Sequence, residues 1–301
     1  MPYLNRGGVK VHYQVRGDGV PLLMCNGWGP PIEWMTELYM PNFADRFRCA
    51  TYDLRGMGRT DAPEDDAAYD MREIAQDGLA VMDELGWKTA HVWGASMGAN
   101  QASIIAILAP ERARSLCISG PDLGIPNMYQ KKYAQVLRDR GTYAAHISKQ
   151  KENAVESARR ACEFYFTPEL LARRSDIVDL VARITAETPA RRIWPSFQKL
   201  IDMVESKVEP DLPDHAEPDE TGFPIWKYLR NIKAPTLILQ GYGDQLIHRD
   251  CAQAAFEEIP NAELRMFKPF RHSFSGSPEI QRQQADWIWM HETSHLGLKG
   301  V

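Results

Sequence analysis

The fold of this chain is decided by the stretch His91-Val-Trp-Gly-Ala-Ser-Met-Gly98. It begins as an apolar run typical of a strand, and a helical run from Gln101 to Leu108 follows it. A serine on a sharp strand-to-helix turn needs small residues two positions before and after it, because the backbone there is strained and closely packed. Gly94 and Gly98 meet this need, and the helix N-terminus favours negative charge beside the turn. The pattern predicts Ser96 as an exposed nucleophile; a glycine-rich turn without catalytic function is the alternative interpretation.

Strand and helix signals alternate on both sides of this turn. Short apolar runs typical of strands recur along the chain at Val9 to Val15, Pro21 to Cys25, Phe47 to Tyr52, Ser115 to Ser119, Pro235 to Gln240 and Glu263 to Phe267. Helical spacing predicts a helix from Met71 to Leu85, which Asp70 caps and Gly86 ends, and a final helix around Gln281 to Met290. Strands that alternate with helices indicate an α/β fold with a mostly parallel, doubly wound sheet.

The strand signal disappears between residues 122 and 222. Helical patterns replace it, and one helix is predicted to begin at Thr167-Pro-Glu169, a cap followed by a first-turn proline and an acidic residue. We therefore expect residues 122–222 to form a helical lid inserted into a core of residues 1–121 and 223–301. The stretch Glu209 to Pro224, rich in Pro, Asp and Glu, is a candidate hinge.

Composition narrows the classes of function. The net charge of −5 gives none of the basic excess that a nucleic-acid or anionic-membrane binder requires. No stretch approaches the roughly 20 apolar residues of a membrane span, and the start of the chain lacks a signal-peptide run, so we expect a cytoplasmic location. The 5 cysteines contain no close pair, which predicts neither a disulfide framework nor a zinc site. Cys25 is an alternative nucleophile, but it has no distinctive motif around it.

A serine nucleophile requires a nearby base, and His272 is the best-placed histidine. It lies in a loop after the last predicted strand, where the chain returns over the top of the sheet. Of the other histidines, His91 is expected to be structural, His146 and His215 to lie on the lid surface, and His248 to cap the next helix. His12 lies in the first hairpin, and His291 and His295 lie in or after the closing helix.

The acid that orients the histidine is expected after a late strand, in the order Ser, Asp, His. Asp244 fits, because Gly241-Tyr-Gly243 turns the predicted strand Pro235 to Gln240 and leaves Asp244 at its carboxyl end. A solvent-exposed turn aspartate is the alternative interpretation of Asp244. The rival acid is Asp122, after the strand that ends at Ser119.

Acyl transfer also requires backbone N–H donors for the oxyanion. Met97, directly after the nucleophile, supplies one. Trp28 is expected to supply the second from the loop Asn26-Gly-Trp-Gly-Pro-Pro31, in which Gly27 lets the backbone approach. An ordinary glycine-proline turn is the alternative interpretation of this loop.

Four blocks of sequence, in the expected order, resemble the α/β-hydrolase superfamily over nearly the whole chain. They are the oxyanion loop Asn26 to Gly29, the block Tyr52-Asp-Leu-Arg-Gly-Met-Gly-Arg59, the nucleophile elbow Gly94 to Gly98, and the acid and base segments with Asp244 and His272. The resemblance implies an α/β-hydrolase fold, with a sheet of the eight-stranded type flanked by helices and an inserted helical lid. It also implies that Asp53 and Arg55 shape a turn beside the elbow.

Two residues depart from the family pattern. Asn26 stands where the family usually has histidine, which leaves the hydrogen bonding behind the oxyanion loop open. Arg271 replaces the glycine that commonly precedes the catalytic histidine. Its charge is expected to lower the imidazole pKa, to meet an anionic substrate, or to form a surface ion pair.

Serine at position 96 disfavours haloalkane dehalogenase and epoxide hydrolase activity, because family members with those activities use an aspartate nucleophile. We expect hydrolysis of a carboxylic ester or lactone of a medium-sized, partly apolar small molecule, through an acyl-enzyme and without metal or organic cofactor. The alternatives are carbon–carbon bond hydrolysis of a diketone-type substrate and a small-molecule receptor that retains the triad. The residues expected to contact the substrate are Gly27, Trp28, Met97, Tyr129 and Trp194.

Overall fold

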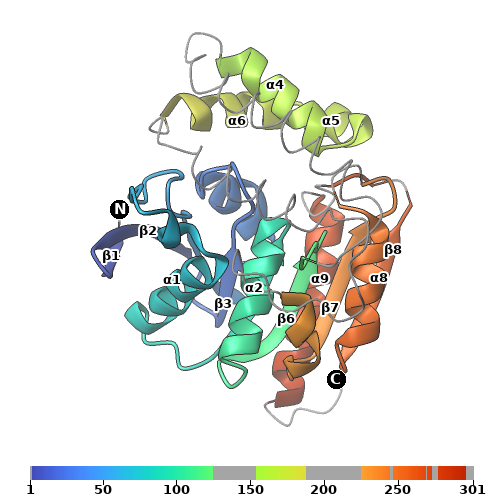
Figure 1. Cartoon of the computed structure of the whole chain (residues 1–301). Helices are drawn as coiled ribbons and strands as arrows, with labels where there is room; N and C mark the ends of the chain where they lie inside the picture. The colour runs from blue at the N-terminus through green and yellow to red at the C-terminus, as the bar shows by residue number, and fades with distance from the viewer. Residues whose placement is uncertain are drawn as a thin grey trace, which may run out of the picture.

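The computed structural model describes residues 2–124, 154–187, 225–244, 247–268, 270–272 and 277–295. Within them, one sheet forms the centre of the molecule, and helices cover both of its faces (Figure 1). The predicted α/β-hydrolase fold with a mostly parallel eight-stranded sheet is confirmed.

The sheet has the strand order β1-β2-β4-β3-β5-β6-β7-β8. The strand β2 pairs antiparallel with β1 and β4, whereas the neighbours from β4 to β8 are all parallel. The strands are β1 (Tyr3–Arg6), β2 (Val9–Arg16), β3 (Val20–Cys25), β4 (Phe47–Tyr52), β5 (Ala90–Ala95), β6 (Ala113–Ser119), β7 (Thr236–Gly241) and β8 (Ala262–Phe267). The carboxyl ends of the parallel strands therefore meet at one edge, where α/β folds place their sites.

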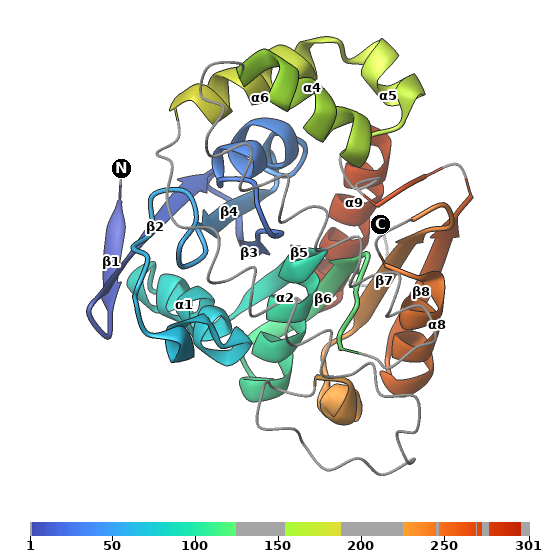
Figure 2. The ribbon, with the colours of Figure 1, turned by 45° about the horizontal axis from the view of Figure 1, so that its top comes forward.

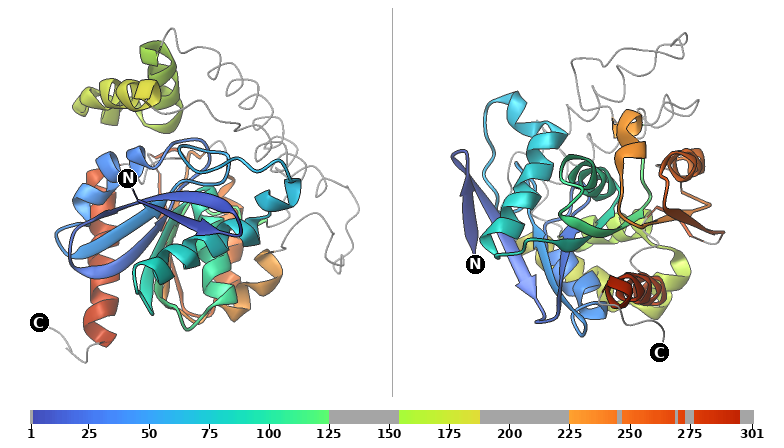
Figure 3. Two further views of the ribbon diagram at one scale, coloured as in Figure 1. Left: turned by 90° about the vertical axis from the view of Figure 1, so that its left-hand side faces the viewer. Right: turned by 90° about the horizontal axis from the view of Figure 1, so that it is seen from below.

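One face of the sheet packs against α1 (Met71–Glu84), α2 (Met97–Leu108) and α8 (Arg249–Glu258). The other face packs against α9 (Pro278–His295) and the short segments η1 (Met35–Tyr39) and η2 (Met40–Asn42). Viewed from below, α9 lies across the sheet from α1, α2 and α8 (Figure 3). The segment η1 is a π-helix, whereas η2 is a 3₁₀ helix, as are η3 (Asp66–Tyr69) and η5 (Ile225–Asn231). No helix of the described residues is long and apolar enough to cross a membrane.

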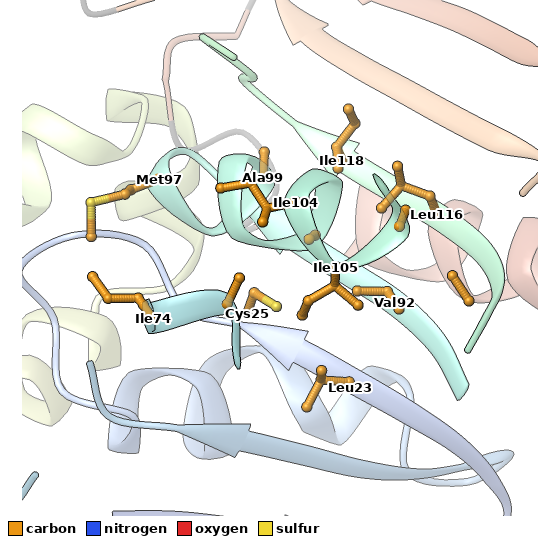
Figure 4. Packing of buried hydrophobic residues seen from close by; sticks show 14 of the residues in the cluster. Leu23, Cys25, Ile74, Val92, Met97, Ala99, Ile104, Ile105, Leu116 and Ile118 are labelled. Carbon is orange, nitrogen blue, oxygen red and sulfur yellow. The ribbon is translucent and has the colours of Figure 1, made fainter. Parts of the chain in front are cut away.

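Sequence signals account for the start and position of two of these helices. The Asp70 side chain accepts a hydrogen bond from the Arg72 N–H and caps α1, as predicted. The helix α2 is buried from Met97 to Ala106 and lies against the centre of the sheet, where Ile105 packs near Val92 of β5 (Figure 4). Because α2 is buried in this way, the turn that joins β5 to α2 is held firmly in place.

Three described helices form a separate layer above the core in Figures 1 and 2. They are α4 (Ala154–Tyr165), α5 (Pro168–Arg173) and α6 (Asp176–Glu187), and α5 begins at Thr167, whose side chain accepts from the Leu170 N–H. Their apolar residues share one hydrophobic cluster with η1 and the sheet. The predicted hinge at residues 209–224 lies outside the described residues, and the lid boundaries 122 and 222 stay a prediction.

Candidate active site

Ser96 lies on a strained turn between β5 and α2. Its φ of 57° falls in the left-handed region, which a residue with a side chain rarely adopts. The turn is held because the Ser96 N–H donates to the Ser119 carbonyl at 2.8 Å and the Ser96 carbonyl accepts from the Ala99 N–H at 2.8 Å. A strained serine at a strand-to-helix turn is the geometry of a nucleophile elbow.

The two glycines of the motif are required by close backbone contacts. A Cβ added to Gly94 would lie 2.1 Å from the Gly98 carbonyl oxygen, and a Cβ added to Gly98 would lie 2.1 Å from the Cys25 carbonyl oxygen. Any larger side chain would force these segments apart. The sequence requirement for small residues on both sides of Ser96 therefore has a direct structural cause.

His272 and Asp244 complete a hydrogen-bond chain that begins at Ser96. The Nε2 atom of His272 lies 2.8 Å from Ser96 Oγ, and its Nδ1 atom lies 2.7 Å from Asp244 Oδ2. His272 is buried, with 6% of its surface exposed, whereas Ser96 is partly exposed. The structure thus brings together three side chains that sequence reasoning had selected from separate segments.

The carboxylate of Asp244 is fixed by two further donors. Its Oδ1 accepts from the Ile247 N–H at 3.0 Å, and its Oδ2 accepts from Gln240 Nε2 at 3.2 Å. Gln240 also donates to the Ile247 carbonyl at 3.2 Å. It therefore links the end of β7 both to Asp244 and to the chain that follows it. Sequence reasoning missed Gln240, although a glutamine inside the apolar strand β7 was a visible signal.

Gly120 is a second residue that sequence reasoning missed. Its φ is +56°, and a Cβ at this position would lie 3.4 Å from His272 Cε1 and 3.6 Å from Asp244 Oδ2. The chain after β6 therefore passes directly beside the histidine and its acid. No local motif marks this glycine, because the contact depends on residues far along the chain.

The predicted oxyanion loop lies against the nucleophile turn. A Cβ added to Gly27 would lie 3.2 Å from the Ala95 carbonyl oxygen and 3.7 Å from Ser96 Cβ. Trp28 and Met97 are both buried. Among the residues that the structure describes, none accepts a hydrogen bond from the Met97 N–H, which begins α2. This N–H is thus available to a ligand atom beside Ser96.

Asn26 has a local role in this loop. Its Nδ2 donates to the Pro30 carbonyl at 2.6 Å and closes the turn, and the Gly29 N–H contacts Met57 Sδ at 3.4 Å. The residue that departs from the family pattern therefore supports the loop from within.

The rival residues are not part of this chain of hydrogen bonds. Asp122 Oδ1 accepts from the Gly124 N–H and stabilises its own turn. Cys25 is fully buried, and burial raises the pKa of its thiol to about 12, so it is a poor nucleophile. His248 accepts from the Asp250 N–H and caps α8, as expected.

Asp53 and Arg55 shape the neighbouring turn, as the resemblance implied. Asp53 accepts hydrogen bonds from His12 Nδ1, the Ile32 N–H and the Arg59 N–H. Arg55 forms a bidentate pair with the buried carboxylate of Asp77, at 2.7 and 2.9 Å.

Of the remaining predicted site residues, Arg271 is exposed, and no ion pair with it is found among the described residues. Tyr129 and Trp194 lie outside the described residues, so their contact with substrate stays a prediction. No cluster of three or more His, Cys, Asp or Glu side chains in the described part of the chain could hold a metal ion.

The fold and this site define the class of the protein. A family model described as alpha/beta hydrolase fold matches residues 20–276, most of the chain. The chain therefore belongs to the α/β-hydrolase family, and it is a hydrolase.

The proteins that are similar to this chain have names that refer to different substrates. The chain is 25% identical over 291 residues to the "Putative carbamate hydrolase RutD" of Azorhizobium caulinodans, covering 93% of this chain and 95% of that protein. It is 33% identical over 115 residues to the 2-hydroxymuconate semialdehyde hydrolase of Pseudomonas sp. strain CF600, which covers 38% of this chain and 40% of that one. The enol-lactonase of Burkholderia xenovorans LB400 has a TM-score of 0.69 at 18% identity, covering 96% of this chain and 100% of that chain, a likeness of fold alone.

Proposed function

We propose that this protein is a serine hydrolase that cleaves a carboxylic ester or lactone of a medium-sized, partly apolar small molecule. Ser96 Oγ attacks the carbonyl carbon while His272 Nε2 takes its proton, and Asp244 holds the imidazole by its Nδ1–H. The N–H groups of Met97 and Trp28 stabilise the oxyanion. The leaving alcohol takes the proton from His272, and water then releases the acid from the acyl-enzyme by the same steps.

The hydrogen-bond chain Ser96–His272–Asp244 carries this proposal. Its two distances, 2.8 and 2.7 Å, are within proton-transfer reach, and they join residues 176 and 28 positions apart in the sequence. A purely structural histidine needs no serine held at a strained φ in front of it. The same fold occurs in a protein named enol-lactonase, so an ester bond is compatible with this fold.

Steady-state hydrolysis of p-nitrophenyl esters and of lactones of increasing acyl length tests the reaction class. We expect turnover that depends on Ser96, and an acyl adduct on the peptide containing Ser96 when a slow substrate is quenched in acid. Turnover that persists in Ser96→Ala would contradict the proposal.

Carbon–carbon bond hydrolysis is the second candidate, because the 2-hydroxymuconate semialdehyde hydrolase is among the relatives and the same three residues serve both reactions. Vinylogous diketones and aryl carbamates therefore belong in the same substrate panel. Faster turnover of a diketone than of every ester would favour this candidate. Tight stoichiometric capture of a ligand with a large thermal shift and negligible turnover would instead identify a receptor that retains its triad.

A further inference from the structure

Gln101 connects the two segments that carry the proposed oxyanion donors. It lies on α2, one helical turn after Met97, and it is fully buried. Its Nε2 donates to the carbonyl oxygen of Asn26 at 3.0 Å and to that of Met97 at 3.3 Å. One amide group thus holds the loop after β3 and the first turn of α2 together.

The bond to Asn26 fixes the direction of the oxyanion loop. The peptide that joins Asn26 to Gly27 is planar and trans, since no cis peptide occurs in the described chain, so holding its carbonyl sets the plane of the whole group. Gly27 and Trp28 therefore leave this peptide in one direction. A small rotation of the same plane would move the Trp28 N–H relative to Ser96.

The Gln101 amide is itself held by Tyr52. The Tyr52 hydroxyl donates to Gln101 Oε1 at 2.9 Å, which orients the amide with its NH₂ group toward the two carbonyls. Tyr52 is fully buried, and burial raises the pKa of its hydroxyl well above the ordinary value, so it stays a donor. Gly78 of α1 gives the ring room, because a Cβ there would lie 2.7 Å from the hydroxyl oxygen.

We propose that Gln101 is a positioning residue that sets the geometry of the oxyanion hole, with Tyr52 orienting its amide. This inference rests on the proposed function of Ser96. Gln101 touches no reacting atom, so its effect reaches the reaction through Asn26 and Met97. The energy of aligned oxyanion donors is realised in the transition state, so misalignment lowers kcat and leaves substrate binding largely unchanged.

Gln101→Met tests the inference, because methionine has a similar length but offers no amide donor. We expect kcat for an aryl ester to fall about 10- to 100-fold while KM changes little, since losing one oxyanion donor outright costs about 10²- to 10³-fold. Affinity for a trifluoromethyl ketone, which places an oxyanion in the same position, is expected to fall by a similar factor. Affinity for the product carboxylate is expected to stay close to that of the wild type.

Two further variants separate positioning from general damage to the fold. Tyr52→Phe removes one oxygen atom and is expected to lower kcat about 3- to 10-fold with the same pattern. Ser103→Ala is the matched control, since Ser103 is equally buried on α2 and donates to the Ala99 carbonyl within that helix. We expect Ser103→Ala to keep the wild-type kcat and inhibitor affinity.

The failure of this inference is distinguishable from the failure of the proposed function. Wild-type kcat and trifluoromethyl ketone affinity in Gln101→Met and Tyr52→Phe, with Ser96 still required for turnover, would overturn the inference alone. Equal losses in Ser103→Ala would also overturn it, because they would show a general packing effect. Turnover that persists in Ser96→Ala would contradict the proposed function, and with it the role inferred for Gln101.

Discussion

The strand β5 carries a Ser–His–acid hydrogen-bond chain at each of its ends. At the carboxyl end, Ser96, His272 and Asp244 are joined by distances of 2.8 and 2.7 Å. At the amino end, His91 Nδ1 lies 2.7 Å from Ser115 Oγ, and its Nε2 lies 3.1 Å from Glu292 Oε2. The two sites contain the same kinds of side chain at similar distances.

The surroundings of the two sites differ in solvent access and backbone conformation. Ser115 and His91 are fully buried within β6 and β5, whereas Ser96 is partly exposed on a turn with a left-handed φ. Glu292 also accepts a hydrogen bond from Arg114 at 2.9 Å. Solvent access, backbone strain and nearby N–H donors therefore distinguish Ser96, the proposed nucleophile, from Ser115, although both sites contain the same residue types.

The largest difference in kcat between the two sites is expected when each serine is replaced by alanine. We expect Ser96→Ala to lower kcat for an aryl ester by about 10⁵-fold or more, as the loss of a triad nucleophile does. Ser115→Ala is the matched control and is expected to keep wild-type kcat, because no substrate reaches it. Rate measurements on both purified variants, with circular dichroism to check the fold, show which serine turnover requires. A large loss in Ser115→Ala would contradict the assignment.

Replacing the acids gives the next largest effect. Asp244→Asn keeps the size of the side chain but replaces the charged acceptor of the imidazole N–H by a neutral amide, which does not hold the required tautomer, so kcat is expected to fall by about 10³- to 10⁴-fold. Asp122→Asn and Glu292→Gln are expected to leave kcat close to wild type. A greater loss in Asp122→Asn than in Asp244→Asn would move the triad to the rival acid.

The buried site around His91 is expected to affect how the stability of the protein changes with pH. Burial lowers the pKa of His91 from 6.5 to about 4, although Glu292 opposes this shift. Between these pH values the unfolded chain binds more protons than the folded one, so stability falls as the pH decreases from about 6.5 to about 4, by about 3 kcal/mol in total. This contribution is absent above pH 6.5, where His91 is neutral in both the folded and the unfolded chain.

Urea unfolding of wild type and His91→Gln at about pH 7 and about pH 4.5 measures this contribution. We expect the variant to lose about 2 kcal/mol less than the wild type between the two conditions, because glutamine does not titrate. Equal losses in both proteins would show that His91 does not control the acid sensitivity.

Gln240, at the carboxyl end of β7, is expected to give the smallest change in rate. Gln240→Leu removes the donor to Asp244 Oδ2 but leaves the Ile247 N–H on Oδ1, so kcat is expected to fall about 3- to 10-fold. Thr236→Val, at the opposite end of β7, is the matched control, since Thr236 is equally buried and donates to the Ala234 carbonyl. Equal changes in the two variants would assign the effect to strand packing.

The sequence predicted the parts of the molecule that depend on local chemistry and on chain order. Ser96 is predicted because a strained turn demands glycines at fixed spacing, and Asp244 and His272 are predicted because each follows a strand in the expected order. The expected contact of Tyr129 and Trp194 with substrate stays a prediction, because it would depend on tertiary packing, which residue spacing does not reveal.

Supporting residues were missed for a related reason. Gln101 contacts a carbonyl 75 positions away, and Gly120 lies beside a histidine from a much later segment. Their only local signals are a buried amide in an apolar helix and a glycine after a strand. Such signals show that a residue is unusual, but only the assembled fold shows its partner.

Covalent labelling compares the two serines in one measurement. The intact protein is treated with a fluorophosphonate probe, digested and mapped by mass spectrometry, alongside Ser96→Ala. We predict a single modified residue, Ser96, with no label on Ser115 and none on the variant. Label on Ser115 or another residue in the wild type, or label that persists in Ser96→Ala, would contradict the assignment of Ser96 as the nucleophile.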